Sequence, residues 1–422
     1  MNPSRAQDSA LRNACKEQIE KRYRHGTNRY CSPAETQKRL APLWGAMGIT
    51  RVANVTGLDN VGIPVVLVYQ PNSRCQASAQ GKGLNLEDVK CSGLMEAVES
   101  FHAEYIDRPV RMASYAEMSR EATVADLVGL PKAAGARFNP HQRLPWIEGH
   151  DLLKDRPAWV PFELVHCDFR IPPPEGSGYF LQTSNGLAAG NHFLEALIHG
   201  ITEVIESDAA ALAGFLSRKE KRKRRISLES IDDADCMKTL EKYRQASIGV
   251  AVWDLTTDIG VACFECEIVP ESDERSRRLY ATRGAGCHPS RSIALLRALL
   301  EAAQGRLTLI AGSRDDFSRR DYLVHRSRRV LEWYRSRICG EKGSADFRQA
   351  PSFEGRTLNE DLDWLLERLR GAEIQEVVAV DLSKPELGIP VVRVIVPHLE
   401  GLNFAPKYAP GRRAKRLRRG SP

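Results

Sequence analysis

Two glutamates stand three residues apart on a segment that otherwise reads as an amphipathic helix. In "SGLMEAVESFHAE", residues 92–104, Glu96 and Glu99 are neighbours on one helix face, and Ser92 lies one turn before Glu96. Buried carboxylates that repel each other are costly, because each must give up its charge or find a cation. For one such segment alone, a solvated charged stripe is the better interpretation.

The same kind of polar pair recurs on two further apolar segments that the residue spacing predicts to be helices. The pairs are Glu203 with Glu206 on "FLEALIHGITEVIESDAAAL" (193–212), and Glu301 with Gln304 on "SIALLRALLEAAQGRLTLI" (292–310). Each of the three predicted helices follows a glycine-rich link. These links are "SAQGKGLN" (78–85), "TSNGLAAGN" (183–191) and "TRGAGCHP" (282–289). The repetition favours a shared site over three unrelated charged stripes.

The chemistry that suits such a site is nucleotide binding with a divalent cation. Mg²⁺ prefers carboxylate oxygens and usually bridges them to nucleotide phosphates. Glycine-rich turns that enter helices would offer backbone N–H groups to phosphate, and Lys82 inside "GKG" adds a positive charge. "QGKG" lacks the spacing of a Walker motif. We therefore expect a metal-dependent nucleotide site of a different architecture.

Strand-like units stand between these helices and share one layout. Each leads from a β-rich run through an Asp-containing turn to Gly, then to a second β-rich run and Pro, which predicts a β-hairpin. The units are "VANVTGLDNVGIPVVLVYQP" (52–71), "VAVWDLTTDIGVACFECEIVP" (250–270) and "VAVDLSKPELGIPVVRVIVP" (378–397). The sequence therefore predicts a mixed α/β (α+β) scaffold built by repetition.

Composition limits the class of protein further. The 422 residues are 42% hydrophobic, carry a net charge of +7 and include ten cysteines, with neither a membrane-spanning apolar run nor a secretory leader pattern. We therefore expect a cytoplasmic protein with reduced thiols. The basic runs 218–225 and 412–419 are interpreted as a solvated loop and a disordered tail; the alternative is a surface for an acidic peptide, protein or RNA. Without aromatic interleaving or a nucleic-acid motif, nucleic acid is the least favoured partner.

The segments "QGKGLNLEDVKCSGLMEAVESFHAE", "SNGLAAGNHFLEALIHGITEVIESDA" and "GAGCHPSRSIALLRALLEAAQGRLTLI" resemble the YcaO superfamily. The resemblance runs from about residue 28 to 400 and is strongest to the stand-alone branch encoded beside a TfuA-like protein. It implies a YcaO-like fold of hairpin and helix units around a central ATP site. The expected organisation is an N-terminal helical extension (1–27), a catalytic domain (28–400) and a basic, disordered tail (401–422).

The resemblance also implies an activity, namely ATP-dependent phosphorylation of the oxygen of a peptide-backbone amide during post-translational modification. The attacking nucleophile would then decide between an azoline, a thioamide and an amidine. The TfuA-associated branch is linked to thioamides, so we expect thioamide formation on a ribosomally made peptide with a TfuA-like partner. A homodimer is a further expected assembly. Two alternatives stay open: an azoline-forming cyclodehydratase, and a non-catalytic scaffold that binds a peptide or partner.

Site residues follow from matching the family's motifs to this chain. The expected ATP-binding residues are Arg29, Thr36, Lys82, Ser92, Glu96, Asn191, Gln304 and Arg306. The expected Mg²⁺ ligands are Glu96, Glu99, Glu195, Glu203 and Glu206. No side chain is assigned as an acid, base or nucleophile.

Two departures from the family pattern bear on catalysis. Many members carry Glu-Arg where this chain has Ser100 and Ser207 after the glutamate. The missing arginine is either replaced by one of four others or lost altogether, and the four are Arg29, Arg74, Arg283 and Arg297. The chain also lacks the proline-rich terminus of azoline-forming members, which counts against cyclodehydration. The pair Cys263 and Cys266 is interpreted as strand packing, not a zinc site, and His199 as a packing residue.

Overall fold

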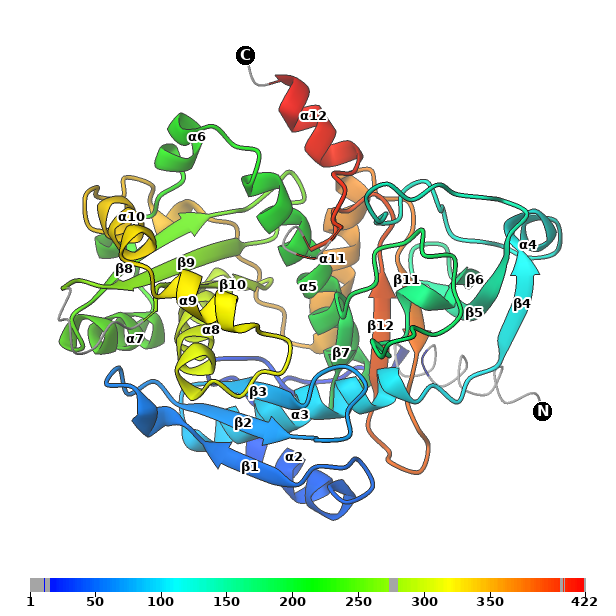
Figure 1. Cartoon of the computed structure of the whole chain (residues 1–422), viewed down its shortest axis with the longest axis horizontal. Helices are drawn as coiled ribbons and strands as arrows, with labels where there is room; N and C mark the ends of the chain where they lie inside the picture. The colour runs from blue at the N-terminus through cyan, green and yellow to red at the C-terminus, as the bar shows by residue number, and fades with distance from the viewer. Residues whose placement is uncertain (1–10, 12–15, 273–279, 403–404, 406, 421–422) are drawn as a thin grey trace.

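The computed structural model describes residues 11, 16–272, 280–402, 405 and 407–420 of the chain. Three antiparallel sheets and long helices make up this mixed α/β fold, and helices α3, α5 and α8 meet between the sheets (Figure 1). The prediction of an α/β scaffold built from hairpin and helix units is confirmed. No helix among the described residues is both long and apolar enough to span a bilayer.

The first sheet has three strands in the order β1-β2-β3, and helix α3 packs against it. Its strands β1 and β2 form the hairpin expected over 52–71, and α2 packs on the outside of α3. The elements are α2 (Pro33–Leu40), β1 (Arg51–Asn54), β2 (Val65–Tyr69), β3 (Ser78–Lys82) and α3 (Leu86–Glu104).

The second sheet repeats this arrangement with the order β10-β9-β8, and helix α8 covers it. Strands β8 and β9 are the hairpin expected over 250–270, in which Cys263 and Cys266 are both buried strand residues. The elements of this lobe are α6 (Arg218–Lys223), α7 (Ala234–Gln245), β8 (Ile248–Asp254), β9 (Cys263–Pro270), β10 (Thr282–Cys287), α8 (Arg291–Ala311), α9 (Arg319–His325) and α10 (Arg328–Ile338).

The third sheet has six strands in the order β4-β5-β11-β12-β7, with β6 paired to β5. Strands β11 and β12 are the third expected hairpin, and helix α5 packs on β12 with α11 against it. The elements are β4 (Val110–Ser114), α4 (Tyr115–Glu121), β5 (Arg143–Asp151), β6 (Arg156–Pro161), β7 (Leu187–Ala189), α5 (Phe193–Ala213), α11 (Leu358–Gly371), β11 (Val378–Asp381) and β12 (Val391–Ile395).

The glycine-rich links are strands rather than the phosphate-binding turns that we expected. Most of the first link forms β3 and most of the third forms β10. A Cβ atom on Gly81 would lie 1.7 Å from the Val89 carbonyl oxygen of α3, and one on Gly286 would lie 2.1 Å from the Ala294 carbonyl oxygen of α8. The glycines therefore allow each helix to lie directly on the backbone of its strand, which fixes the helix faces relative to the sheets.

The two ends of the chain differ from the expected description. The tail predicted to be disordered contains helix α12 (Arg412–Gly420), in which Ala414 is buried and Arg413 forms an ion pair with Asp208 of α5 at 3.1 Å. Most of the predicted N-terminal helix lies outside the described residues. Residues 17–27 run in extended and turn conformation, with isolated bridges at Glu20 and Tyr23.

Candidate nucleotide and metal site

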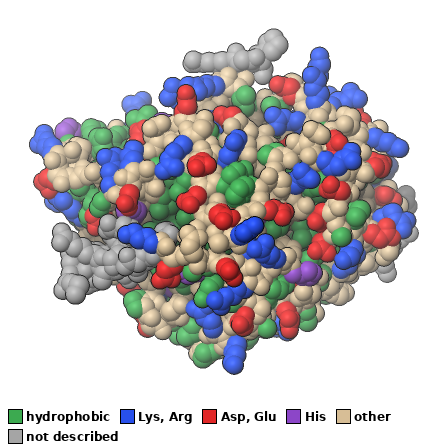
Figure 2. All heavy atoms as spheres, turned by 180° about the vertical axis from the view of Figure 1, so that it is seen from behind, with side chains coloured by type: hydrophobic (Ala, Val, Ile, Leu, Met, Phe, Trp, Pro, Cys, Tyr) green, Lys and Arg blue, Asp and Glu red, His purple; other side chains and the backbone are tan. Residues whose placement is uncertain are grey.

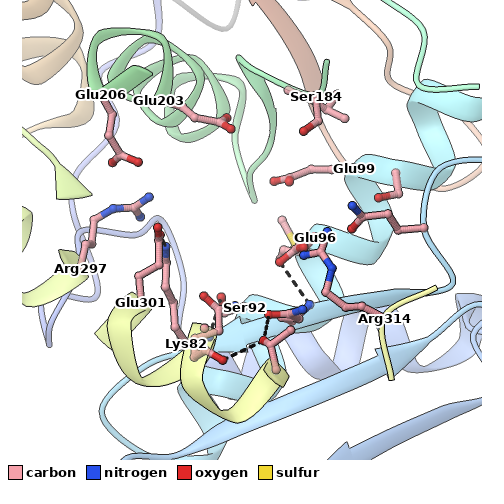
Figure 3. A pocket seen from close by; sticks show the side chains of 18 of the residues that line it. Lys82, Ser92, Glu96, Glu99, Ser184, Glu203, Glu206, Arg297, Glu301 and Arg314 are labelled. Atoms are coloured by element: carbon pink, nitrogen blue, oxygen red, sulfur yellow. Dashed lines mark hydrogen bonds and ion pairs between the residues drawn. The ribbon is translucent and has the colours of Figure 1, made fainter. Parts of the chain in front are cut away.

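A cavity of about 790 Å³ lies where α3, α5 and α8 meet. Five glutamates line it: Glu96 and Glu99 from α3, Glu203 and Glu206 from α5, and Glu301 from α8. Figure 3 shows the glutamates of α3 and α5 pointing into the same space, with Arg297 and Glu301 on the side of Glu206. The structure thus brings together the repeated polar pairs that were separate in the sequence.

Helix geometry explains which side chains reach this cavity. On α8 the residues one turn apart, Arg297, Glu301, Gln304 and Thr308, all line it. Ser92 lines the cavity from α3, one turn before Glu96, and Lys82 does so from the end of β3. Eight predicted residues therefore line one cavity, and they are Arg29, Lys82, Ser92, Glu96, Glu99, Glu203, Glu206 and Gln304.

Burial makes the negative charge of these carboxylates unfavourable. It raises the pKa of Glu203 to about 8, with further repulsion from Glu206. Burial also raises the pKa of Glu96 to about 7, and that of Glu206 to about 7 with repulsion from Glu301. The pKa of Glu99 lies well above its ordinary value for the same reason. Such a cluster is stabilised when a cation enters it.

The positive side chains of the cavity do not neutralise these four carboxylates. Burial opposes a charge on Glu301, but its ion pair with Lys82 outweighs that effect and lowers its pKa. Within the described part of the chain, Glu96, Glu99, Glu203 and Glu206 form no ion pair. Glu96 accepts a hydrogen bond from the Gln80 N–H at 3.2 Å, and Glu99 accepts one from the Ala189 N–H at 2.8 Å.

The carboxylates therefore fit divalent cations, provided that other ligands complete the coordination. No group of three His, Cys, Asp or Glu side chains among the described residues forms a ready-made metal cage. Mg²⁺ is commonly held by one or two carboxylates together with water and phosphate oxygens. Two pairs of glutamates on opposite sides of one cavity suit that mode of binding.

A second cluster of predicted residues lies behind Arg29. Arg29 lines the cavity but forms an ion pair with Glu195 at 3.1 Å, and the Tyr30 N–H donates to the other Glu195 oxygen. The Thr36 hydroxyl donates to Asn191 Oδ1 at 3.1 Å, while Asn191 Nδ2 is buried without a partner in the part of the chain that the structure describes. Thr36, Asn191 and Glu195 are thus gathered with Arg29 but are not among the cavity-lining residues. An incoming phosphate would compete with Glu195 for Arg29.

Arg306 does not face the cavity, contrary to our expectation. It is buried, and its guanidinium pairs with both carboxylate oxygens of Asp59, at 2.6 and 3.2 Å. The reason is helix phase, since a residue two positions after Gln304 points to the other side of α8. Arg306 therefore ties α8 to the turn after β1, a structural role.

Several cavity residues escaped the sequence reasoning. Arg314 follows the left-handed Gly312 that ends α8, and no sequence signal marked it. Gln80 accepts a hydrogen bond from the Thr308 hydroxyl at 2.5 Å, a contact between segments 228 positions apart. His199 also lines the cavity, and burial holds its pKa well below the ordinary value. His199 lies one turn before Glu203, so helical spacing places the two residues on the same face of α5.

The fold and this cavity together define an α/β protein with a polar site suited to a nucleotide triphosphate and divalent cations. The sequence matches the family model described as YcaO cyclodehydratase, ATP- and Mg²⁺-binding, over residues 80–400. The chain therefore belongs to the YcaO family of ATP-dependent enzymes, whose cofactors are ATP and Mg²⁺. The resemblance stated from the sequence is confirmed.

Relatives and solved structures agree with this assignment. The chain is 37% identical to an uncharacterized protein in the tfuA 3' region of Rhizobium leguminosarum bv. trifolii, over 88% of this chain and 89% of that protein. It is 32% identical to an uncharacterized protein of Methanothermobacter thermautotrophicus, over 91% of this chain and 97% of that protein. YcaO from Methanopyrus kandleri, solved with AMPPCP and Mg²⁺, has a TM-score of 0.73 at 22% identity, over 93% of this chain and 99% of that one.

A heterocyclase solved in complex with substrate and cofactor shares the fold with a TM-score of 0.75 at 21% identity, over 93% of this chain. The chain spans 55% of the length of that heterocyclase.

Proposed function

We propose that this protein replaces the oxygen of a peptide-backbone amide with sulfur, at the expense of ATP and together with a TfuA-like protein. The observation that carries the proposal is the shared cavity in which four carboxylates, none of them ion-paired among the described residues, face Lys82 and Arg297. An amide oxygen is a poor leaving group, and phosphorylation makes it a good one. The relative whose printed name places it beside tfuA supports thioamide formation.

In this proposal the glutamates hold Mg²⁺, and the basic residues neutralise phosphate. Glu96, Glu99, Glu203 and Glu206 would hold the cation, which supplies positive charge next to the triphosphate. Lys82 would move from Glu301 to phosphate oxygens when the nucleotide binds. Arg29 would do the same from Glu195.

Arg297 is the best candidate to replace the arginine that many family members carry where this chain has Ser100 and Ser207. Arg74 is paired with Asp168 at 3.4 Å, and Arg283 lies 3.8 Å from Glu265 with its side chain 53% exposed. Arg297 lines the cavity beside Glu206 and Glu301, its Nε has no partner, and it forms no ion pair among the described residues. A half-buried guanidinium of this kind is available for a phosphate.

Cyclodehydration to an azoline is the second candidate, favoured by the cyclodehydratase description of the family model. The products are separated by mass spectrometry, because exchange of oxygen for sulfur adds about 16 Da and cyclodehydration removes about 18 Da after attack by a nucleophile. The assay combines the chain with a TfuA-like protein, ATP, Mg²⁺, sulfide and peptides encoded by neighbouring genes. Loss of 18 Da from the peptide would replace the thioamide assignment with the azoline one.

The fate of oxygen separates both reactions from a scaffold that only binds. In water enriched in ¹⁸O, phosphate formed by amide activation carries the unlabelled amide oxygen, whereas phosphate formed by ATP hydrolysis carries ¹⁸O. We expect unlabelled phosphate in proportion to product. The Glu99→Gln variant should lose this phosphate, and Glu87→Gln, an exposed change on the same helix, should keep it. Binding of Mg-ATP without peptide-dependent phosphate would favour the scaffold.

A further inference from the structure

Two cysteines meet at the edge of the cavity, although they lie 92 positions apart in the chain. Cys75 lines the cavity and is partly exposed, whereas Cys167 lies behind it and is buried. Their thiols lie close enough to interact with each other. Neither cysteine has a part in the nucleotide and metal site described above.

The segments that carry these cysteines are held together at several points. The Phe169 N–H donates to the Arg74 carbonyl at 2.9 Å, and Arg74 pairs with Asp168. The Cys167 N–H donates to the Ala103 carbonyl at 3.0 Å. The contact between the thiols is therefore fixed by the backbone on both sides.

Arg393 places a positive charge next to Cys167. Arg393 is 3% exposed, Nη1 contacts Cys167 Sγ at 4.0 Å, and Nε has no hydrogen-bond partner among the described residues. Arg393 forms no ion pair with a carboxylate within the described ranges, and its charge acts on both Cys167 and Glu203, so a Cys167 thiolate would have a cation beside it. The interaction with Cys75 and the charge of Arg393 lower the pKa of Cys167 against the effect of burial. The same interaction, together with burial, raises the pKa of Cys75.

We propose that Cys75 and Cys167 form a sulfur relay, in which Cys75 carries a sulfane sulfur to the amide and Cys167 releases it. The inference rests on the proposed thioamide formation and names the chemical class of its sulfur source, a persulfide of a donor protein or small thiol. Cys75 is the entry point because it faces the cavity. Cys167 is the resolving thiolate because Arg393 stabilises its charge.

The relay balances in atoms and electrons. The Cys75 thiolate takes the outer sulfur from the donor persulfide, and the donor leaves as a thiolate. The terminal sulfur of Cys75 then forms a bond to the amide carbon, and the amide oxygen leaves as phosphate. Cys167 attacks Cys75 Sγ, the bond between Cys75 Sγ and the transferred sulfur breaks, and the thioamide is released. The transferred sulfur gains two electrons, and the two thiols lose them in forming a disulfide. A dithiol reductant such as reduced thioredoxin restores the pair.

The test uses the full chain without any peptide. Reduced protein is mixed with glutathione persulfide, released sulfide is measured, and the cysteines are alkylated and mapped by mass spectrometry. With no amide present, Cys167 attacks the Cys75 persulfide and hydrosulfide leaves. We expect about one equivalent of sulfide and a Cys75–Cys167 disulfide in the unmodified protein. In Cys167→Ser the sulfur should stay on Cys75, with an added mass of about 32 Da and without sulfide release.

The chain supplies its own controls. Cys263 and Cys287 also face each other, as paired residues of β9 and β10, but both are buried and neither lines the cavity, so this pair should stay reduced. Cys339 is exposed, and Cys339→Ser should behave like the unmodified protein. Cys75→Ser should lose both products, and a melting curve of each variant shows that it is folded. Should Cys167→Ser not fold, Cys167→Ala gives the same readout.

Sulfur distributed equally over the accessible cysteines, or none on Cys75, would overturn the relay. A thioamide made from sulfide by a chain whose Cys75 never accepts sulfur would keep the proposed function and overturn the relay. Sulfur transfer to Cys75 in a chain that forms an azoline would support the relay pair and overturn the thioamide assignment.

Discussion

Replacement of Glu203 by glutamine should stabilise the nucleotide-free protein, and more so at high pH. An unfolded glutamate ionises near its ordinary pKa, whereas Glu203 keeps its proton up to about pH 8 in the folded protein. Between these values the folded protein binds more protons than the unfolded chain, so stability falls as the pH rises. Glutamine keeps the shape of the protonated side chain and removes this loss.

The size of the effect follows from the pKa difference. With an unfolded pKa of about 4.3 and a folded pKa of about 8, ionisation of Glu203 costs about 2 kcal/mol at pH 6 and about 4–5 kcal/mol at pH 8.5. The gain from Glu203→Gln should therefore grow by about 2–3 kcal/mol between these pH values. With about 2 cal/mol/K of unfolding entropy per residue over 422 residues, that difference corresponds to about 3 °C in Tm. Glu206 loses a repelling neighbour in this variant, which acts in the same direction.

The assay measures the Tm of both proteins by calorimetry, in EDTA, at pH 6 and at pH 8.5. The histidines whose pKa burial lowers contribute equally to both proteins and cancel in the double difference. Among the described residues they are His102, His166, His192, His199 and His288. Glu367→Gln on the exposed side of α11 is the matched control and should show no pH-dependent gain. A double difference of zero, or a larger gain at pH 6, would refute the reasoning.

Two further substitutions test the architecture. Gly286→Ala places a Cβ 2.1 Å from the Ala294 carbonyl oxygen and should cost about 1–3 kcal/mol by urea denaturation, whereas Gly371→Ala, with no atom within 4 Å of its Cβ, should cost nothing. Equal stability of the two variants would contradict the direct packing of α8 on β10. Arg306→Ala leaves Asp59 buried without its partner and should cost about 3–5 kcal/mol. Its folded fraction should bind Mg-ATP as the unmodified protein does by calorimetric titration, and a specific loss of that affinity would return Arg306 to the nucleotide site.

The helices and strands could be predicted because their hydrophobic residues recur with the spacing of a helix or of a strand. The hairpins at β1/β2, β8/β9 and β11/β12 and the three long helices lie where alternation and helical spacing placed them. The meeting of the glutamates at one cavity also followed from the sequence, since three repeated polar pairs share a site more readily than three isolated ones. The glycine-rich links were misread because glycine marks both a turn and a close approach of helix to strand, and the sequence does not distinguish these uses.

Contacts between distant segments were beyond the sequence. The ion pair of Arg29 with Glu195, and the thiol contact of Cys75 with Cys167, depend on how separate lobes pack. Arg306 does not line the cavity for a local reason. It lies two positions after Gln304 on α8, so the two side chains point to different sides of the helix. The side of a helix that faces a cavity can be named only when at least one residue on that side is known. The folded structure provides that residue, and the sequence alone does not.

On the face of the molecule opposite to that of Figure 1, acidic and basic side chains are interspersed among the described residues (Figure 2). The long basic segment of α12 is held by Arg413, which contacts both Asp208 and Asp258.

The central claim is that the glutamates of α3 and α5 bind divalent cations, which contact the phosphates of a nucleoside triphosphate in one cavity. A crystal structure with Mn²⁺ and a non-hydrolysable ATP analogue tests it most directly, because Mn²⁺ favours the same oxygen ligands as Mg²⁺ and gives an anomalous signal. The account predicts anomalous peaks between the carboxylates of Glu96 or Glu99 and those of Glu203 or Glu206, each in contact with phosphate oxygens. Nucleotide bound elsewhere, or anomalous peaks away from these four side chains, would contradict it.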